Sequence, residues 1–322
     1  MQNFKKHSIA VVIPCFKVEN HIKKVVAEIP DYVNSIILVN DASLDHTAEI
    51  LEQLAKENPK ITVVTHEKNQ GVGGAMVSGF KEALNQNHEA LIKIDGDGQM
   101  NVAYFNRLLM AVFDEKYHFA KGNRFSDLKM LKSMPAIRRV GNLGMSFLIK
   151  MASGYWNIFD PANGYFCIHC SVLKKLDLDR LSKRFFFESS LLIEMYYSGA
   201  TIKDIPMPAI YADEKSNLSV WKTLFSFPPK LISAFFRRIW LRYFIYDFNI
   251  GSLYIFFGVP LFLFGIIFGI VKWIHYAFLQ TGTPTGTIMI SVISLVLGFQ
   301  MLLSAIQYDI NAENPFKIDN GD

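Results

Sequence analysis

The sequence has few cysteines and little charge, and each shortage excludes a class of protein. Three cysteines among 322 residues are too few for a disulfide framework, so we expect the polar part of the chain in a reducing compartment, the cytoplasm by default. Charged residues make up only 19% and the net charge is +4, which argues against a nucleic-acid partner. The 51% of apolar residues and the mean hydropathy of +0.20 exclude a disordered chain and predict contact with lipid.

Two common nucleotide-binding motifs are also missing. No GxxxxGK[ST] segment occurs, which disfavours a P-loop ATPase. The glycine-rich segment 71–75 lacks the third glycine of a dinucleotide fingerprint, since Met76 stands there, and it follows the third predicted strand instead of the first. These glycines serve either close helix packing or direct contact with a nucleotide, and both interpretations stay open. Cys167 and Cys170 have no second Cys/His cluster at zinc-binding spacing, so alternation on a strand is the favoured interpretation.

Two long apolar runs dominate the C-terminal quarter. Residues 253–271 and 287–306 each approach the roughly 20 residues that cross a bilayer as a helix. Lys272 is the one formally charged residue from 253 to 306, and buried helices of a water-soluble protein would need a polar face. We therefore predict two membrane spans, whose glycines permit close helix packing and make a homo-oligomer plausible: Gly258, Gly265 and Gly269.

The positive charge is concentrated just before these runs. Residues 215–246 carry six basic side chains and no acidic one, interleaved with aromatic residues, as in a helix lying on an anionic leaflet. The positive-inside rule then places the preceding domain and both termini in the cytoplasm. The predicted organisation is a catalytic domain over 1–214, basic amphipathic juxtamembrane helices over 215–250, a two-helix transmembrane hairpin over 251–308 and a cytoplasmic tail over 309–322.

Residues 1–214 alternate apolar strand patterns with helical patterns, which predicts an α/β fold with a mainly parallel sheet. Ligands of such sheets bind beyond the carboxyl ends of the strands. Acidic side chains gather there, after the first, second and fourth strands: Glu19, Asp41, Asp95 and Asp97. Asp95 and Asp97, two residues apart, offer hard oxygen ligands for Mg²⁺ or Mn²⁺, and such a metal could also hold a diphosphate. Asp-Gly-Asp by itself, however, also forms an ordinary turn.

Four segments in this order, VVIPCFKVEN, ILVNDASLDHT, NQGVGGAMVSGFKEA and IKIDGDGQ, resemble the family 2 glycosyltransferases with a GT-A fold. The resemblance continues through GNRF, RRVGN, DPANGYF and FFFES and covers nearly the whole chain. The subgroup that it resembles best is the polyprenyl-phosphate glycosyltransferases, which include dolichol-phosphate mannose synthase. The resemblance implies a GT-A domain that binds a nucleotide sugar, UDP- or GDP-linked.

The resemblance also implies roles for the residues at the donor side. Pro14, Glu19 and Asp41 match positions that line the base and ribose, and Asp95, Asp97 and Gln99 match positions around the metal and the diphosphate. Two departures leave the base open between uracil and guanine. Lys17-Val18 replaces the usual Asn-Glu, and Asn40-Asp41 replaces two aspartates.

On the acceptor side, the resemblance implies that arginines hold the phosphate of the lipid, for which their planar fork is suited. Arg124 and Arg139 match these positions, with Arg138 and Asn142 beside them, although a solvated helix face explains one of the paired arginines equally well. Asp160 matches a position facing the transferred sugar, or forms a turn. Glu188 stands where members acting on sugar hydroxyls carry a Glu-Asp general base, but Ser189 follows it here.

These features predict a membrane-anchored, inverting, metal-dependent glycosyltransferase that moves a sugar from a nucleotide sugar to a polyprenyl phosphate. Asp97, Arg124, Arg139 and Asp160 are its expected catalytic residues. One alternative is transfer to a hydroxyl of a glycolipid or glycan. The chain lacks the QxxRW motif of processive synthases, which argues against this alternative. The other is a catalytically silent nucleotide-sugar-binding scaffold, which would not need the acidic ligands that this chain retains.

Overall fold

The structure is a computed structural model that describes residues 4–126, 136–207, 220–312 and 314–316. The side chains of residues 126, 136–140 and 220–224 are outside this description. The chain divides into two compact units, one built by residues up to 235 together with Phe316, and the other by residues 236–315.

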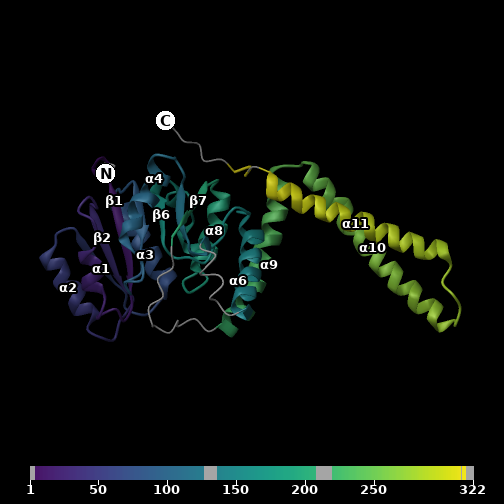
Figure 1. Cartoon of the computed structure of the whole chain (residues 1–322), viewed down its shortest axis with the longest axis horizontal. Coiled ribbons are helices and arrows are strands. Elements are labelled where there is room, and N and C mark those ends of the chain that lie inside the picture. Colours follow the sequence, from purple (N-terminus) through teal and green to yellow (C-terminus); the bar gives the residue numbers. More distant parts are fainter. Residues whose placement is uncertain (1–3, 127–135, 208–219, 313, 317–322) are drawn as a thin grey trace. The chain divides into compact units, whose positions relative to one another are not determined.

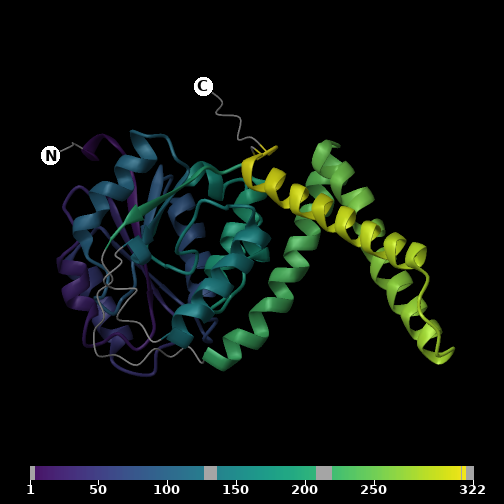
Figure 2. The same cartoon turned by 45° about the vertical axis from the view of Figure 1, so that its right-hand side comes forward.

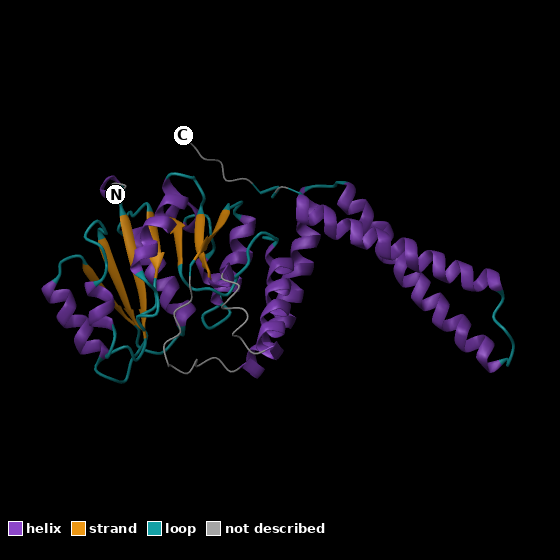
Figure 3. Ribbon diagram, in the orientation of Figure 1, coloured by secondary structure: helices purple, strands orange, loops and turns teal. Residues whose placement is uncertain are grey.

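A seven-stranded sheet organises the first unit, in the order β3-β2-β1-β4-β6-β5-β7 (Figures 1 and 3). Its strands are β1 (Ile9–Cys15), β2 (Ser35–Asn40), β3 (Ile61–Thr65), β4 (Ala90–Lys93), β5 (Phe119–Asn123), β6 (Phe166–His169) and β7 (Ile202–Pro206). Only β6 runs antiparallel to its neighbours, β4 and β5. The mainly parallel α/β sheet predicted from the sequence is therefore confirmed.

Helices cover both faces of this sheet because successive side chains of the central strands point to opposite faces. On β1, Val11 and Ile13 join a core with α1, α2 and α4, whereas Ala10 and Val12 join a second core with α3, α6, α7 and α8. The helices of this unit are α1 (Ile22–Ala27), α2 (Thr47–Glu57), α3 (Val72–Asn85), α4 (Phe105–Phe113), α6 (Ala136–Ser153), α7 (Cys170–Leu173), α8 (Phe187–Tyr197) and most of α9 (Val220–Trp240). Single turns of 3₁₀ helix are η1 (Phe4–Lys6), η2 (Val102–Tyr104), η3 (Arg124–Ser126) and η4 (Leu178–Arg180).

The second unit contains two helices that are long and apolar enough to span a membrane, α10 (Ile250–Phe278) and α11 (Thr285–Asn311). They pack side by side as a hairpin (Figure 2). Glycines form the seam between them: a Cβ at Gly265 would lie 2.6 Å from the Leu295 nitrogen, and one at Gly298 would lie 2.7 Å from the Phe262 Cα. Gly258, Gly265 and Gly269 therefore serve packing within the hairpin, and a homo-oligomer stays a prediction.

A buried ion-pair cluster closes the base of this hairpin. Arg238 at the end of α9 holds both carboxylate oxygens of Asp309 on α11, at 2.9 and 2.8 Å. Arg242 and Tyr243, on the π-helical turn η5 (Leu241–Tyr246), bond the same carboxylate at 3.2 and 2.8 Å. The basic residues of 215–246 were predicted to face a lipid leaflet, but the structure buries two of them, Arg238 and Arg242, and pairs them inside the protein.

Candidate active site

The carboxyl ends of β1, β2 and β4 border a cavity of about 610 Å³. Four of the residues predicted from the sequence line it: Pro14, Asp41, Asp95 and Asp97. They come together because β1 lies between β2 and β4 in the sheet and runs parallel to both. Glu19 and Gln99 lie outside the lining of this cavity, as do Arg124, Asn142 and Asp160.

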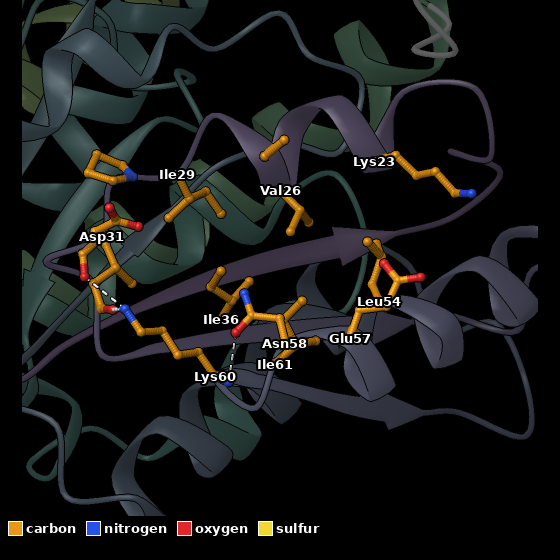
Figure 4. Close-up of a pocket in the computed structure, with 13 residues that line it drawn as sticks. Lys23, Val26, Ile29, Asp31, Ile36, Leu54, Glu57, Asn58, Lys60 and Ile61 are labelled. Carbon is orange, nitrogen blue, oxygen red and sulfur yellow. Dashed lines mark hydrogen bonds between the residues drawn. The ribbon is translucent and has the colours of Figure 1, made fainter.

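A second cavity, of about 330 Å³, lies between α1, α2 and the starts of β2 and β3 (Figure 4). Lys60 crosses its polar end and donates hydrogen bonds to the carbonyl oxygens of Asp31 and Val33. It contains none of the predicted site residues. The chemistry expected at carboxyl strand ends therefore points to the larger cavity.

The turns after β1 and β2 have unusual backbone conformations. Lys17 and Ala42 adopt positive φ angles of 57° and 55°, which cost free energy for residues other than glycine. Side chains hold the two turns together, since Ser43 Oγ accepts a hydrogen bond from the Lys17 nitrogen and Asn40 Oδ1 accepts one from the Ser43 nitrogen. Both strained turns border the larger cavity.

Asp41 organises the loop that leads into α3. Its carboxylate accepts hydrogen bonds from the backbone nitrogens of Gln70 and Gly71 at 2.8 and 2.7 Å, and it lies 2.8 Å from His66 Nδ1. Its side chain is 3% exposed. Both carboxylate oxygens thus already have protein partners. The sequence predicted a contact between Asp41 and a ribose but did not predict these internal hydrogen bonds. Glu19 similarly accepts the backbone N–H of His46, before the first turn of α2.

The glycines of segment 71–75 pack against a distant part of the chain. A Cβ at Gly71 would lie 2.7 Å from the Lys183 oxygen, and Gly73 faces the same stretch, at 182–183. The Gly74 nitrogen donates a 3.0 Å hydrogen bond to that Lys183 oxygen. This contact positions the segment before α8, whose Arg184 and Phe185 line the cavity. Close packing is therefore observed for these glycines, whereas contact with a nucleotide stays a prediction, since Gly71 also lines the larger cavity.

Asp95 and Asp97 follow β4 directly. Asp95 Oδ1 lies 2.8 Å from the ammonium of Lys93, whose side chain is 1% exposed, and Lys93 also lies 3.7 Å from Glu188. Asp97 Oδ1 accepts the backbone N–H of Gln99 at 3.0 Å, which shapes the turn. Burial by itself lowers the pKa of Lys93, but the charges of Asp95 and Glu188 outweigh it, so the pKa is raised. Burial also raises the pKa of the Glu188 carboxyl, against the opposing charge of Lys93.

Arg124 and Asp160, for which the sequence predicted separate roles, form one ion pair. Arg124 donates from Nε and Nη2 to the two oxygens of Asp160 at 2.8 and 3.1 Å, and its backbone nitrogen donates to the same carboxylate. Burial alone would raise the pKa of Asp160, but the hydrogen bonds and charge of Arg124 hold that pKa below its ordinary value. Buried Lys121 donates to the Asp160 carbonyl oxygen. Asn142 is exposed on α6, and the side chains of Arg138 and Arg139 fall outside the described residues.

The sequence profile of glycosyl transferase family 2 matches residues 10–177, which include both turns and the Asp95–Asp97 pair. The chain belongs to this family. It is 30% identical to the UDP-N-acetylglucosamine–dolichyl-phosphate N-acetylglucosaminyltransferase of Methanococcus voltae, over 64% of this chain and 86% of the relative. It is 25% identical to the undecaprenyl-phosphate mannosyltransferase of Micrococcus luteus, over 62% of this chain and 82% of the relative.

Solved structures support the same fold for this family 2 glycosyltransferase. Glucosyl-3-phosphoglycerate synthase of Mycobacterium tuberculosis, crystallised with Mn²⁺, UDP and glucosyl-3-phosphoglycerate, superimposes with a TM-score of 0.53. The match covers 73% of this chain and 81% of the synthase, at 18% identity. The predicted GT-A fold is confirmed.

The residues at the Asp95–Asp97 edge of this glycosyltransferase suit a hard divalent cation. Both carboxylates are partly exposed and line the same cavity. Among the described residues, no group of three or more Asp, Glu, His or Cys side chains is placed to enclose a metal ion. Such a pair fits a cation that takes its remaining ligands from water and from phosphate oxygens, as Mg²⁺ commonly does.

The Cys167 and Cys170 thiols are buried, and burial raises the pKa of Cys170 to about 12.

Three basic residues of this site were missed in the sequence: Lys93, Lys121 and Arg184. Lys93 and Lys121 are both fully buried on central strands. A lysine inside an apolar strand pattern, as in ALIKI, is a signal that could have identified Lys93, because an unpaired ammonium is costly to bury. Nothing in the local sequence of Arg184 indicates that it reaches the cavity.

Proposed function

We propose that this family 2 glycosyltransferase is membrane-anchored and moves a sugar from a nucleotide sugar to a polyprenyl phosphate. Binding of a nucleotide-sugar donor is supported by one observation: Asp41, Asp95 and Asp97 line the same cavity at the carboxyl edge of the sheet. The proposed acceptor is supported by two relatives, one named as a dolichyl-phosphate N-acetylglucosaminyltransferase and the other as an undecaprenyl-phosphate mannosyltransferase. The two apolar helices suit an enzyme whose acceptor resides in a bilayer.

In this proposal the cavity binds the donor. Pro14 and Asp41, with Glu19 supporting the adjacent turn, shape the end that takes the base and ribose of a UDP- or GDP-sugar. Asp95, Asp97 and Gln99 hold Mg²⁺ or Mn²⁺ next to the diphosphate. When bound, the metal neutralises the negative charge that develops on the leaving nucleoside diphosphate.

The reaction is a single displacement. An oxygen of the lipid phosphate attacks the anomeric carbon, the bond from that carbon to the diphosphate oxygen breaks, and the nucleoside diphosphate leaves with the bonding electrons, inverting the configuration. Arg124, fixed by Asp160, and Arg139, with Arg138 and Asn142 as further candidates, attract the incoming phosphate. Asp160 orients Arg124 and thereby shapes the part of the site that takes the transferred sugar.

The surroundings of Glu188 support a phosphate acceptor over a hydroxyl. A phosphate monoester has a second pKa of about 6, so it is largely dianionic at neutral pH and needs no general base. A hydroxyl acceptor would need a carboxylate placed to accept its proton. Glu188 instead lies 3.7 Å from the buried Lys93, and its side chain is only 16% exposed.

The membrane topology belongs to the same proposal. Residues 1–214 form the catalytic domain, 215–250 the juxtamembrane helices, 251–308 the transmembrane hairpin and 309–322 a tail. The catalytic domain and both termini are cytoplasmic, because the basic residues precede the first span and the connection between the spans is nearly uncharged.

The test is to incubate membranes containing the full chain with polyprenyl phosphate and a panel of UDP- and GDP-sugars, and to analyse the lipid extract by mass spectrometry. We expect a polyprenyl-phospho-sugar from one donor, dependent on Mg²⁺ or Mn²⁺ and absent with the Asp97→Ala variant. Transfer of the sugar to a glycolipid hydroxyl, with polyprenyl phosphate unchanged, would contradict the proposed acceptor.

A further inference from the structure

Lys93 is a buried cation shared by two acidic side chains from different parts of the fold. It ends β4, and its ammonium lies 2.8 Å from Asp95 Oδ1 and 3.7 Å from Glu188 Oε1. Asp95 follows β4, whereas Glu188 lies in the first turn of α8. One ammonium therefore links the edge of the donor cavity to the helix that follows the Arg184–Phe185 segment.

Gly164 provides the space that this ammonium occupies. A Cβ at position 164 would lie well under 3.0 Å from Lys93 Nζ, and 3.3 Å from Glu188 Oε1. The glycine has no positive φ angle, so the backbone conformation does not require it. A side chain here would therefore displace the head group of the lysine, the flexible end of that side chain, and would not meet backbone.

We propose that Lys93 is a positioning residue for the metal and donor site, and that Gly164 keeps its ammonium in place. The ion pair with Lys93 engages Oδ1 of Asp95 and fixes the rotation of that carboxylate. Its Oδ2 is then the oxygen presented to the metal or to the donor. The inference rests on the donor half of the proposed function and does not depend on the identity of the acceptor.

The role of Lys93 is distinct from simple neutralisation of Glu188. If neutralisation of this buried carboxylate were its whole role, removing both charges together would restore the site. If Lys93 positions Asp95, the double substitution would restore stability but not the affinity for metal. Groups that orient metal ligands typically contribute 10- to 100-fold to metal affinity.

The experiment measures Mn²⁺ binding by the full chain in detergent, in the presence of UDP, by electron paramagnetic resonance. We expect Lys93→Met to weaken Mn²⁺ binding by about 10- to 100-fold, and Gly164→Ala, which leaves the lysine present but displaces its ammonium, to weaken it by about tenfold. Lys81→Met is the matched control, because Lys81 pairs with Asp179 on the surface, and it should change nothing. Asp97→Ala should abolish Mn²⁺ binding by the protein.

The double variant Lys93→Met/Glu188→Gln keeps the test decisive if Lys93→Met alone fails to fold. We expect it to fold with a thermal midpoint close to that of the unsubstituted protein and still to bind Mn²⁺ about tenfold or more weakly. Unchanged Mn²⁺ affinity in this double variant, or in Gly164→Ala, would overturn the positioning role. A protein that binds Mn²⁺ as expected yet never uses polyprenyl phosphate would refute the proposed acceptor and leave this inference standing.

Discussion

The contact between the start of α3 and the segment before α8 gives a sharp prediction for Gly73→Ala. A methyl group at position 73 would lie within 3.0 Å of the Ser182 carbonyl oxygen, and 2.9 Å from both the Lys183 carbonyl carbon and the Phe187 Cβ. Carbon and carbonyl oxygen atoms normally approach to about 3.3 Å. Two of these neighbours are backbone, so the segment itself has to move away from α3.

The magnitude follows from three contributions. Overpacking a tight contact costs about 1–3 kcal/mol, and loss of the hydrogen bond from the Gly74 nitrogen to the Lys183 oxygen costs about 0.5–1.5 kcal/mol. The better helix propensity of alanine offsets up to about 1 kcal/mol. The net expectation is a destabilisation of roughly 2 kcal/mol, or about 4–8 °C in the thermal midpoint of a domain of this size.

The assay is thermal unfolding of the full chain in detergent, with UDP affinity measured alongside. Gly144→Ala is the matched control, because Gly144 lies on the exposed side of α6 and a Cβ there would meet nothing within 4 Å. The control should be unchanged or slightly stabilised and should bind UDP normally. We expect Gly73→Ala to bind UDP more weakly, because Arg184 and Phe185 move with the segment. A Gly73→Ala protein as stable as the control would refute the reasoning.

Three further predictions address the chemistry of the site. Asp97→Ala should abolish sugar transfer while leaving the protein folded and membrane-associated, because its carboxylate is assigned to the metal; near-normal turnover with unchanged metal dependence would contradict that assignment. Glu188→Gln should lower kcat by less than about tenfold, whereas loss of an essential base costs 10²–10⁴-fold, so a thousandfold loss with normal substrate binding would favour a hydroxyl acceptor. Burial lowers the pKa of Lys121 from 10.5 to about 8, so between these pH values the unfolded chain binds the proton that the folded chain has released. The unfolding free energy should therefore rise with pH across this window, by at most about 1.4 kcal/mol per pH unit, and Lys121→Met should lack this rise when the two proteins are compared by denaturant unfolding.

The sequence predicted what depends on local pattern and strand order. Apolar strand segments that alternate with helical segments predicted the mainly parallel sheet, and the carboxyl ends of its strands place Asp41, Asp95 and Asp97 at one edge, where the structure has them. The lengths and compositions of the apolar runs likewise predicted α10 and α11, which are long and apolar enough to cross a membrane.

Contacts between segments that are distant in the sequence could not be predicted from the local pattern of residues. Gly73 meets residues more than 100 positions away, so its packing role was indistinguishable from nucleotide contact in the sequence. The pairing of Arg124 with Asp160 was hidden for the same reason, because either residue alone is a reasonable ligand for a substrate. Burial of Arg238 depends on Asp309, which lies 71 residues later in the chain, and a count of basic residues could not separate Arg238 from its exposed neighbours.

The glycine seam of the hairpin has a consequence for how the sequence can vary. At Gly265 and Gly298 any side chain would have to separate two helix backbones, so substitutions there should be selected against even though both positions lie in an apolar segment. Many outward positions, such as Phe256 and Ile267, are exposed large hydrophobic residues, for which a lipid environment demands little beyond an apolar side chain. Among homologues, α10 and α11 should therefore drift freely in the identity of their bulky residues while the spacing of their small residues stays fixed.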